Sequence, residues 1–430
     1  MDLAALDHRH VWHPFTQQQG WSEETPLMIE RGEGVYLFDT EGRRYIDGTA
    51  SLWCNVHGHR HPVIDEAIHA QVDRISHSTM LGLSHPGATE LAGRLVEIAP
   101  PGLTRVFYSD SGATAAEIAL KIAFQYQQQR GESGRDSFVR LRDAYHGDTI
   151  GSVSVGGIDL FHSTYRPLLF ETYAAEPGDA ADMERVLAAH AGDVAAVIVE
   201  PLVQGAAGMI VHPPGYLRAV RELCDRHGLL LICDEVATGF GRTGTMFACE
   251  QEDVVPDLLC MAKGISAGYL PLAATLTSEE IYGAFLGAPA EQRTFFHGHT
   301  YTGNPLACAA ALASLVVFEE ERTLERMQPK IGLLEELLAA VEAMPEVAEV
   351  RWRGFMIGID LGEHDPDLRL GHRVTLEARE RGAIVRPLGD TVVVVPPLSI
   401  SEAELRQLLA ITTKSIEAAV ASLPTPSPAA

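Results

Sequence analysis

The sequence predicts an α/β protein with a large domain built on a doubly wound, mostly parallel sheet and a smaller α+β domain. From about residue 62 to 315, short apolar runs alternate with helical patterns, which is typical of such a sheet. The first 61 residues instead contain turn signals and short strands, and a long charged helix pattern begins a second regime after residue 315. We therefore expect residues 62–315 to form the large domain, and residues 1–61 and 316–422 together to form the smaller one.

The individual elements follow from turn signals and periodicity. Residues 34–42 and 44–48 predict a hairpin that turns at residues 40–42. In the large domain we expect strands at residues 105–108, 138–141, 195–200, 229–234 and 258–261, and helices at residues 114–129 and 216–227. In the last part we expect a strand at residues 353–360, a hairpin of residues 383–387 and 391–395 around 388–390, a helix from the capping box at 401–404 to about 421, and a frayed tail at 423–430.

Composition excludes several classes of partner and site. The 58 acidic residues against 33 Lys and Arg give a net charge of −25, which argues against nucleic acid or an anionic membrane as a partner. The six cysteines lack Cys-x-x-Cys spacing, so we expect buried free thiols in a reducing compartment. No basic segment followed by an apolar core opens the chain, and no apolar stretch reaches the roughly 18 residues of a membrane span. We expect a cytoplasmic protein.

Lys263 and Asp234 carry the strongest functional signal. Each ends a short apolar run, and Lys263 follows Asp234 by 29 positions. A lysine one strand beyond a strand-end acid is the arrangement that a pyridoxal phosphate enzyme requires. The amine forms a Schiff base with the aldehyde, and the acid keeps a proton on the pyridine nitrogen. A buried carboxylate such as Asp234 needs a cationic partner, which on sequence alone is either this pyridine or a structural arginine.

Two further loops follow strands of the same predicted sheet. Residues 109–113 open a helix with small side chains, which lets backbone N–H groups face a phosphate, although an ordinary helix cap has the same composition. In the loop at 143–148, Tyr145 could stack on a flat ring and His146 could supply a hydrogen bond, although loop aromatics often only pack.

Two other patterns are weak. Residues 239–244 match the letters of the dinucleotide fingerprint, but they neither follow a strand closely nor open a helix, so we interpret them as turns. The histidines at 57–61 and 297–299 lack the spacing of a zinc site, and we expect structural roles and no metal.

Taken together, these motifs resemble the class III aminotransferases, which have the fold-type I, aspartate-aminotransferase-like architecture. The resemblance runs from residue 12 to about 422. It rests on blocks in the family's order and spacing, at residues 110–112, 145–147, 200–205, 234–244, 263–264 and 298–305. Within the class, the chain looks most like the branch that makes 7,8-diaminononanoate from 8-amino-7-oxononanoate in biotin synthesis. The markers of that branch lie at residues 12–16, 47–53, 56–58, 75–77, 144–149 and 383–389.

The resemblance implies a role for each matching residue. Lys263 would be the Schiff-base lysine and Asp234 the pyridinium partner, with Tyr145 near the ring as a third catalytic residue. The other implied cofactor-binding residues are Ser111, Gly112 and Ala113 on the phosphate, His146, and His299 and Thr300, whose segment reaches the cofactor of the partner subunit. The implied substrate-binding residues are Phe15, Leu52, Trp53, Tyr145, Asp148, Gly298 and the carboxylate-binding Arg386. The resemblance also implies that the protein is a homodimer whose two subunits share residues in each active site.

Two positions leave the amino donor open. Enzymes of the branch that use S-adenosylmethionine usually have Tyr where this chain has Phe15, and paired tryptophans where it has Leu52 and Trp53. A smaller branch that uses lysine is similar to this chain at both positions. The alternatives are another class III transaminase such as an ω-amino acid:pyruvate enzyme, a nicotinamide-dependent oxidoreductase that rests on residues 239–244, and a non-catalytic binding protein of the same fold.

Overall fold

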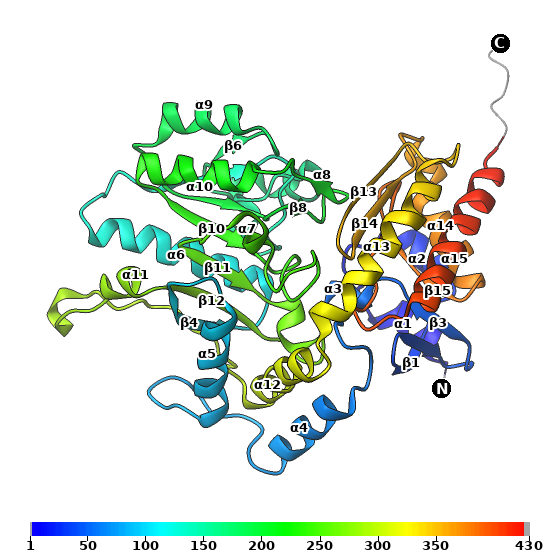
Figure 1. The fold of residues 1–430 in the computed structure, drawn as a ribbon, viewed down its shortest axis with the longest axis horizontal. Coiled ribbons are helices and arrows are strands. Elements are labelled where there is room, and N and C mark those ends of the chain that lie inside the picture. The colour runs from blue at the N-terminus through cyan, green and yellow to red at the C-terminus, as the bar shows by residue number, and fades with distance from the viewer. Residues whose placement is uncertain (1, 425–430) are drawn as a thin grey trace.

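In the computed structural model, which describes residues 2–424, a seven-stranded sheet forms the centre of the larger lobe (Figure 1). The strands lie in the order β4-β12-β11-β10-β7-β5-β6. They are β4 (Leu103–Ser109), β5 (Ser137–Leu141), β6 (Tyr173–Ala175), β7 (Val194–Val199), β10 (Leu230–Asp234), β11 (Leu258–Met261) and β12 (Ala273–Ser278). The neighbours from β11 to β6 pair in parallel, whereas β12 is antiparallel to both β11 and β4. The sheet is therefore mostly parallel, as the sequence predicts.

Helices cover both faces of this sheet because its strands are apolar on both sides. In β10, Leu230 and Ile232 pack with α6 (Gly112–Gln129) on one face, while Leu231 and Cys233 face the core of the other. That second face is covered by α5 (Pro86–Ile98), α9 (Ala180–His190), α10 (Tyr216–His227) and α12 (Pro305–Glu320). The shorter elements of this lobe are α4 (Pro62–Val72), α7 (Ile150–Ser154), α8 (Asp159–His162), η1 (Ser163–Leu168), β8 (Val203–Gln204), β9 (Ile210–Val211), η2 (Ala248–Glu252), η3 (Lys263–Ser266), α11 (Glu279–Gly283) and η4 (Pro289–Glu291).

The smaller lobe joins the two ends of the chain. One sheet has the order β1-β2-β3-β15 and the other β13-β14-β17-β16. The pairing of β15 with β3 is parallel and connects residues that lie more than three hundred positions apart. The elements are α1 (Leu3–His10), α2 (Gln18–Glu23), β1 (Ile29–Glu33), β2 (Tyr36–Asp39), β3 (Arg44–Asp47), α3 (Ala50–Trp53), α13 (Thr323–Glu342), β13 (Glu349–Arg353), β14 (Met356–Asp360), η5 (Pro366–Leu368), α14 (Leu370–Glu380), β15 (Ala383–Ile384), β16 (Arg386–Leu388), β17 (Thr391–Val394) and α15 (Glu402–Ala421).

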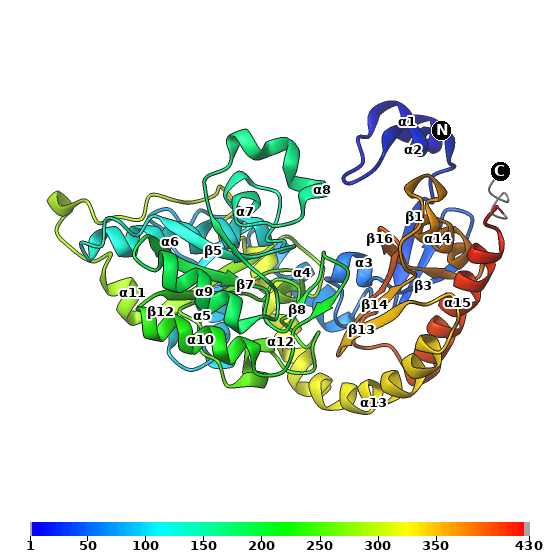
Figure 2. The same ribbon diagram turned by 90° about the horizontal axis from the view of Figure 1, so that it is seen from above.

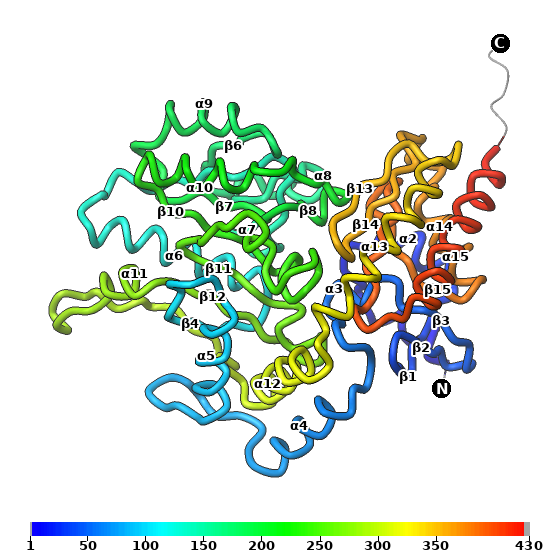
Figure 3. The backbone as a smooth tube through the Cα atoms, in the orientation of Figure 1, coloured from blue at the N-terminus to red at the C-terminus, as the bar shows by residue number. Residues whose placement is uncertain are grey.

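The connections between the lobes are visible in the other views. Figure 2 shows α1 and α2 standing above the smaller lobe, on the side where α8 projects from the larger one. In the trace of Figure 3, the chain passes from α12 into α13 and so crosses to the smaller lobe. Within residues 2–424, no helix is both long enough and apolar enough to cross a membrane.

Most of the predicted elements are confirmed, with several corrections. The hairpin of β2 and β3, the helix α10 and the capping box that opens α15 lie where they were expected. The helix predicted from residue 114 begins at Gly112, because Ser111 is its cap. The strand predicted at 353–360 is shorter, because Arg353 ends β13 and β14 begins at Met356. The strand predicted at 383–387 is split, since β15 joins the sheet of β3 while β16 forms the hairpin with β17. Strand β12 was missed, because it contains two alanines and only one large apolar residue, although its threonines favour a strand.

The division of the chain into domains at residues 61 and 315 remains a prediction. The limit at residue 315 falls inside α12, which continues to Glu320. Of the tail predicted to be frayed, residues 425–430 lie outside the described residues. All six cysteines are free, and Cys54 alone among them is not fully buried.

Candidate active site

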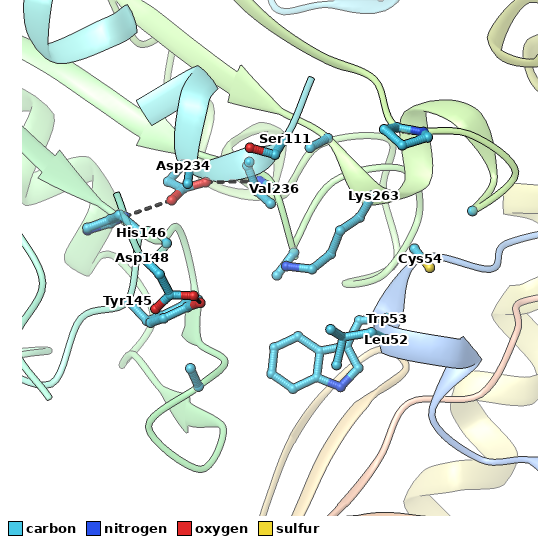
Figure 4. A pocket seen from close by; sticks show the side chains of 18 of the residues that line it. Leu52, Trp53, Cys54, Ser111, Tyr145, His146, Asp148, Asp234, Val236 and Lys263 are labelled. Carbon is cyan, nitrogen blue, oxygen red and sulfur yellow. Dashed lines mark hydrogen bonds and ion pairs between the residues drawn. The ribbon is translucent and has the colours of Figure 1, made fainter. Parts of the chain in front are cut away.

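A cavity of about 740 Å³ lies between the two lobes, where the central strands of the large sheet end. Its lining comes from the loops after β4, β5, β7, β10 and β11, and from residues 52–54, 386 and 388 of the smaller lobe. Parallel strands bring their carboxyl ends to one edge, so the side chains that follow them converge there. Figure 4 shows side chains from both lobes facing this cavity.

The structure brings most of the predicted site residues together. Those that line the cavity are Phe15, Leu52, Trp53, Ser111, Gly112, Ala113, Tyr145, His146, Asp148, Asp234, Lys263 and Arg386. The three that do not line it are Gly298, His299 and Thr300, which the resemblance assigns to the site of a partner subunit.

Asp234 is held at the end of β10 by two hydrogen bonds. One carboxylate oxygen lies 2.7 Å from His146 Nδ1, and the other accepts from the backbone N–H of Val236 at 3.1 Å. Its partner in the protein is therefore His146, not a structural arginine. Within the described residues, His146 Nε2 is buried without a hydrogen-bond partner. A proton on Nδ1 makes His146 a donor to Asp234, and the carboxylate of Asp234 also borders the cavity, where it could contact a cation.

Lys263 lies two positions after the end of β11 and begins the short helix η3. Its φ of 44° is unusual for a residue with a side chain, and Gly264 comes next because a Cβ there would lie 2.6 Å from Phe240 Cβ. The side chain extends into the cavity, and Nζ lies 5.4 Å from the centre of the Trp53 ring (Figure 4). Burial lowers the pKa of Lys263, and the charges of Asp234 and Glu200 offset part of this effect. A lowered pKa favours the neutral, nucleophilic form of the amine.

The start of α6 provides a recess for an anion. Ser111 caps this helix, and the first helical residues Gly112 and Ala113 border the cavity. A Cβ at Gly112 would lie 2.5 Å from Val236 Cγ1. The loop after β5 also approaches closely, because Gly147 at φ 112° lies against Ala113 with no room for a side chain. The start of this 18-residue helix therefore borders the cavity between two closely packed loops, and the first N–H groups and the dipole of a helix favour a phosphate there.

Tyr145 is fixed at both its backbone and its hydroxyl. Its hydroxyl donates to Asp148 Oδ2 at 2.7 Å, and its backbone N–H donates to Glu200 Oε1 at 3.0 Å. Burial, with a smaller contribution from Asp148, raises the pKa of Tyr145. The phenol is therefore neutral at physiological pH, and its ring borders the cavity as a flat wall.

Glu200 is the main residue that the sequence prediction left without a role. It directly follows β7, whereas Asp234 is the last residue of β10, and it also accepts from the backbone N–H of Gly205 at 2.9 Å. Burial raises the pKa of Glu200 to about 7. The signal that identified Asp234, an acid at the end of a buried strand, was present here too.

The smaller lobe contributes the outer wall. Arg386 lies on β16 and faces the cavity, and burial lowers its pKa. Trp53 is 7% exposed, and within the described residues its indole N–H has no partner. Phe15 packs against Phe161 with the ring centres 5.3 Å apart, so the wall is closed by a contact between the N-terminal segment and α8 that sequence reasoning missed.

The segment of Gly298, His299 and Thr300 lies outside this cavity. Gly298 and Thr300 are exposed, while His299 Nδ1 lies 2.7 Å from Asp110 Oδ2. Asp110 itself borders the cavity, so His299 is connected to the start of α6 through Asp110 without lining the cavity.

The weak patterns of the sequence have structural roles. Residues 239–244 form turns, in which the buried Arg242 donates to the carbonyl oxygens of Pro396 and Asn55. His57 is bonded to Ser314, His59 to Asp47 and His61 to Glu321. The rings of His57 and His61 therefore join segments that are distant in the sequence, while His59 holds a nearby one.

The residues present fit pyridoxal phosphate. The cavity holds an amine of lowered pKa, a carboxylate bonded to the His146 ring, and a helix start kept open by Gly112. These groups suit an aldehyde, a pyridinium nitrogen and a phosphate, respectively.

Comparison with known proteins agrees with this geometry. Residues 18–416 match the family described as Aminotransferase class-III. The adenosylmethionine-8-amino-7-oxononanoate aminotransferase of Nitratidesulfovibrio vulgaris is 58% identical over 95% of this chain and 80% of its own length. The crystal structure of the enzyme of that name from Methanocaldococcus jannaschii is 45% identical, with a TM-score of 0.95 over 97% of this chain and 98% of its own. A PLP-bound amine transaminase from an uncultivated Pseudomonas species is 39% identical, with a TM-score of 0.89 over 96% of this chain and 98% of its own.

Proposed function

The chain belongs to the class III aminotransferases, and we propose that it converts 8-amino-7-oxononanoate into 7,8-diaminononanoate in biotin synthesis. The observation that carries this proposal is Arg386. This half-buried guanidinium faces the same cavity as Lys263 and Asp234, in a chain 58% identical to a relative named for that substrate. A carboxylate at the far end of the acceptor would find its natural bidentate ligand there.

The enzyme depends on pyridoxal 5'-phosphate, as its family does. When bound, this cofactor supplies an aldehyde that carries the amino group and a ring that accepts electrons. Ser111, Gly112 and Ala113 would hold the phosphate at the start of α6. Asp234 would keep a proton on the ring nitrogen, and Tyr145 would cover the face of the ring.

Lys263 moves the proton in this proposal. Its Nζ would take a proton from the carbon that bears the donor amine and pass it to the aldehyde carbon of the bound cofactor. In the second half of the cycle it would move a proton from that carbon to the former carbonyl carbon of the acceptor. Its lowered pKa keeps the amine able to accept that proton. The buried Trp53 would exclude water from part of the same space, which strengthens the electrostatic interactions inside it.

The donor is the finer part of the proposal. The names of the relatives support S-adenosylmethionine. Phe15 and Leu52 support L-lysine as a second candidate, because they replace a hydroxyl and an indole in the wall that receives the donor. Both donors are cations, which suits a cavity that contains the Asp148 carboxylate.

A two-part assay tests the function. The holoenzyme is mixed with each donor in turn, and the loss of the cofactor's visible band reports the first half-reaction. Addition of 8-amino-7-oxononanoate to the donor-treated enzyme should restore the band and yield 7,8-diaminononanoate. Restoration by pyruvate, with no response to 8-amino-7-oxononanoate, would instead favour an ω-amino acid transaminase.

We also propose a homodimer with shared sites. The exposed segment at residues 298–300 supports this, because it lies outside the cavity of its own chain and continues into exposed Tyr301. Thr300 would then reach the phosphate held by the partner subunit. A cytoplasmic location is proposed as well, supported by the six free thiols.

A further inference from the structure

A second, smaller cavity lies in the smaller lobe, behind the wall of the active site. It has a volume of about 360 Å³, which is within the range of small-molecule sites. Its apolar lining consists of Trp21, Leu27, Ile29, Leu37 and Ile384, and its polar lining of Asp47, Thr49, Ser51 and Arg379. We call this space the seam cavity, because it lies where the N-terminal segment meets α14 and the sheet of β1, β2, β3 and β15.

Arg379 is the charged group of the seam cavity that lacks a partner. It projects from the last turn of α14, and among residues 2–424 its Nε is buried without a hydrogen-bond acceptor. The nearby acid Glu24 is already engaged, since its Oε1 lies 2.8 Å from His372 and 3.6 Å from Arg369. Burial lowers the pKa of Arg379, as expected for a guanidinium taken from water without a bound anion.

Asp47, the acid of the seam cavity, is already satisfied. Its oxygens accept from the backbone N–H of Ser51 at 2.8 and 3.0 Å, and His59 Nε2 lies 2.9 Å away. It therefore does not need Arg379 as a counter-ion, and its own charge is dispersed over several donors. The unmatched groups are a guanidinium and an apolar wall.

From these observations we propose that the seam cavity binds a small aliphatic carboxylate, with the carboxylate on Arg379 and the chain against Leu27, Leu37 and Ile384. The fork of a guanidinium matches a carboxylate in two hydrogen bonds, and the apolar wall gains from covering a hydrocarbon chain. This site is separate from the carboxylate role proposed for Arg386.

The seam cavity also adjoins the active site through one short segment. Ser51 borders the seam cavity, whereas Leu52 and Trp53 border the active-site cavity. Ala50, Ser51 and Trp53 have φ angles of 46°, 62° and 61°, a conformation that residues with side chains rarely adopt. A ligand in contact with Thr49 and Ser51 therefore stabilises the present position of the Leu52 and Trp53 wall.

Titration calorimetry with heptanoate tests the site. The protein is the holoenzyme carrying Arg386→Ala, a choice that rests on the proposed function and removes the carboxylate ligand of the main cavity. We expect heptanoate to bind at one site, and Arg379→Gln in the same background to weaken that binding at least about tenfold. Arg381→Gln, two positions away and paired with Glu377 at the surface, should leave the affinity unchanged. Heptan-1-ol, which has the same chain without the charge, should bind more weakly than heptanoate.

A second variant and a second readout keep the outcome decisive. Leu27→Trp should fill the seam cavity while Arg379 is kept, and it should abolish heptanoate binding, so the site can be tested even if Arg379→Gln does not fold. Heptanoate should also slow amide hydrogen exchange at residues 49–53 in Arg386→Ala, but not in Arg379→Gln/Arg386→Ala. Two results would overturn the proposed carboxylate site in the seam cavity while leaving the proposed reaction untouched. One is equal affinity for heptanoate with and without Arg379, and the other is no binding of heptanoate to the Arg386→Ala protein.

Discussion

At the scale of single residues, the site is arranged around two acids that end neighbouring strands. Asp234 ends β10 and Glu200 follows β7, and these two strands pair in the sheet. Each acid binds the loop after β5, Asp234 through the His146 ring and Glu200 through the backbone of Tyr145. Because Tyr145 and His146 are adjacent, the two acids hold the same part of this loop, and the loop cannot shift without breaking both contacts.

The amine at position 263 is the first residue to test. Lys263→Ala should lower turnover by about 10²–10⁴-fold, because none of the other described residues that line the cavity carries an amine to move the proton. Borohydride treatment followed by peptide mapping should leave the cofactor attached at residue 263 in the native enzyme and unattached in the variant. Lys414→Ala, at an exposed position on α15, is the matched control. Attachment of the cofactor in Lys263→Ala would contradict the assignment.

Arg386 is the residue that sets the acceptor in our proposal. Arg386→Ala should raise the KM for 8-amino-7-oxononanoate about tenfold or more, since a charged hydrogen bond is lost. The first half-reaction with S-adenosylmethionine or lysine should change less than the second. Arg406→Ala, exposed on α15, serves as the control. An unchanged KM would show that the acceptor carboxylate binds elsewhere.

Glu200 gives a prediction for the pH dependence of stability. Its pKa is raised from the ordinary 4.5 to about 7, so the folded state binds this proton more tightly than the unfolded chain. The stability it contributes is fully present below pH 4.5 and is lost as the pH rises through about 7, on the order of 3 kcal/mol in total. Glu200→Gln lacks this dependence. The free energy of unfolding of the variant should therefore rise relative to that of the native enzyme between pH 5 and pH 8.

Denaturant unfolding of both holoenzymes at several pH values measures the effect. Glu222→Gln, an exposed acid on α10, should follow the curve of the native enzyme. If the free energy of unfolding of Glu200→Gln varies with pH in parallel with that of the native enzyme, the pKa of Glu200 is not raised in the folded state.

At the scale of elements, the recess for the phosphate depends on how closely the loop after β5 approaches α6. Gly147→Ala places a side chain against Ala113 at a positive φ, so strain and overlap act together. We expect a loss of about 1–2 kcal/mol from strain, a further loss of about 1–3 kcal/mol from overlap, and weaker cofactor binding.

The control for Gly147 separates these two causes. Gly131 has a φ of 87° with open space around it, so Gly131→Ala should show the strain without the overlap or the loss of cofactor affinity. Unfolding free energies and equilibrium titration with pyridoxal phosphate distinguish the two variants. Equal effects on cofactor affinity would argue against the close approach as the cause.

At the scale of the whole molecule, the shared site predicts complementation between subunits. Thr300→Glu should repel the phosphate of the partner's site, and Lys263→Ala should disable its own site. A mixed dimer of these two variants retains one site with both native residues, so random mixing should restore about a quarter of the native activity. Activity that never exceeds that of the separate variants would show that Thr300 acts within its own chain or not at all.

The sequence by itself determined the elements and the chemistry that lies at their ends. Local propensity and periodicity place β10, β11 and α10 almost to the residue, and a charged side chain at the end of an apolar strand is visible without any structure. The family resemblance then assigns Lys263, Asp234 and Arg386 to one site.

Only the tertiary structure decided how the site is supported and enclosed. The bond between His146 and Asp234, the contact of Phe15 with Phe161 and the split of residues 383–387 between two sheets all join segments far apart in the chain. The seam cavity around Arg379 depends in the same way on segments from both ends of the chain. Such contacts follow from packing and shape complementarity between surfaces, which no local pattern of residues encodes.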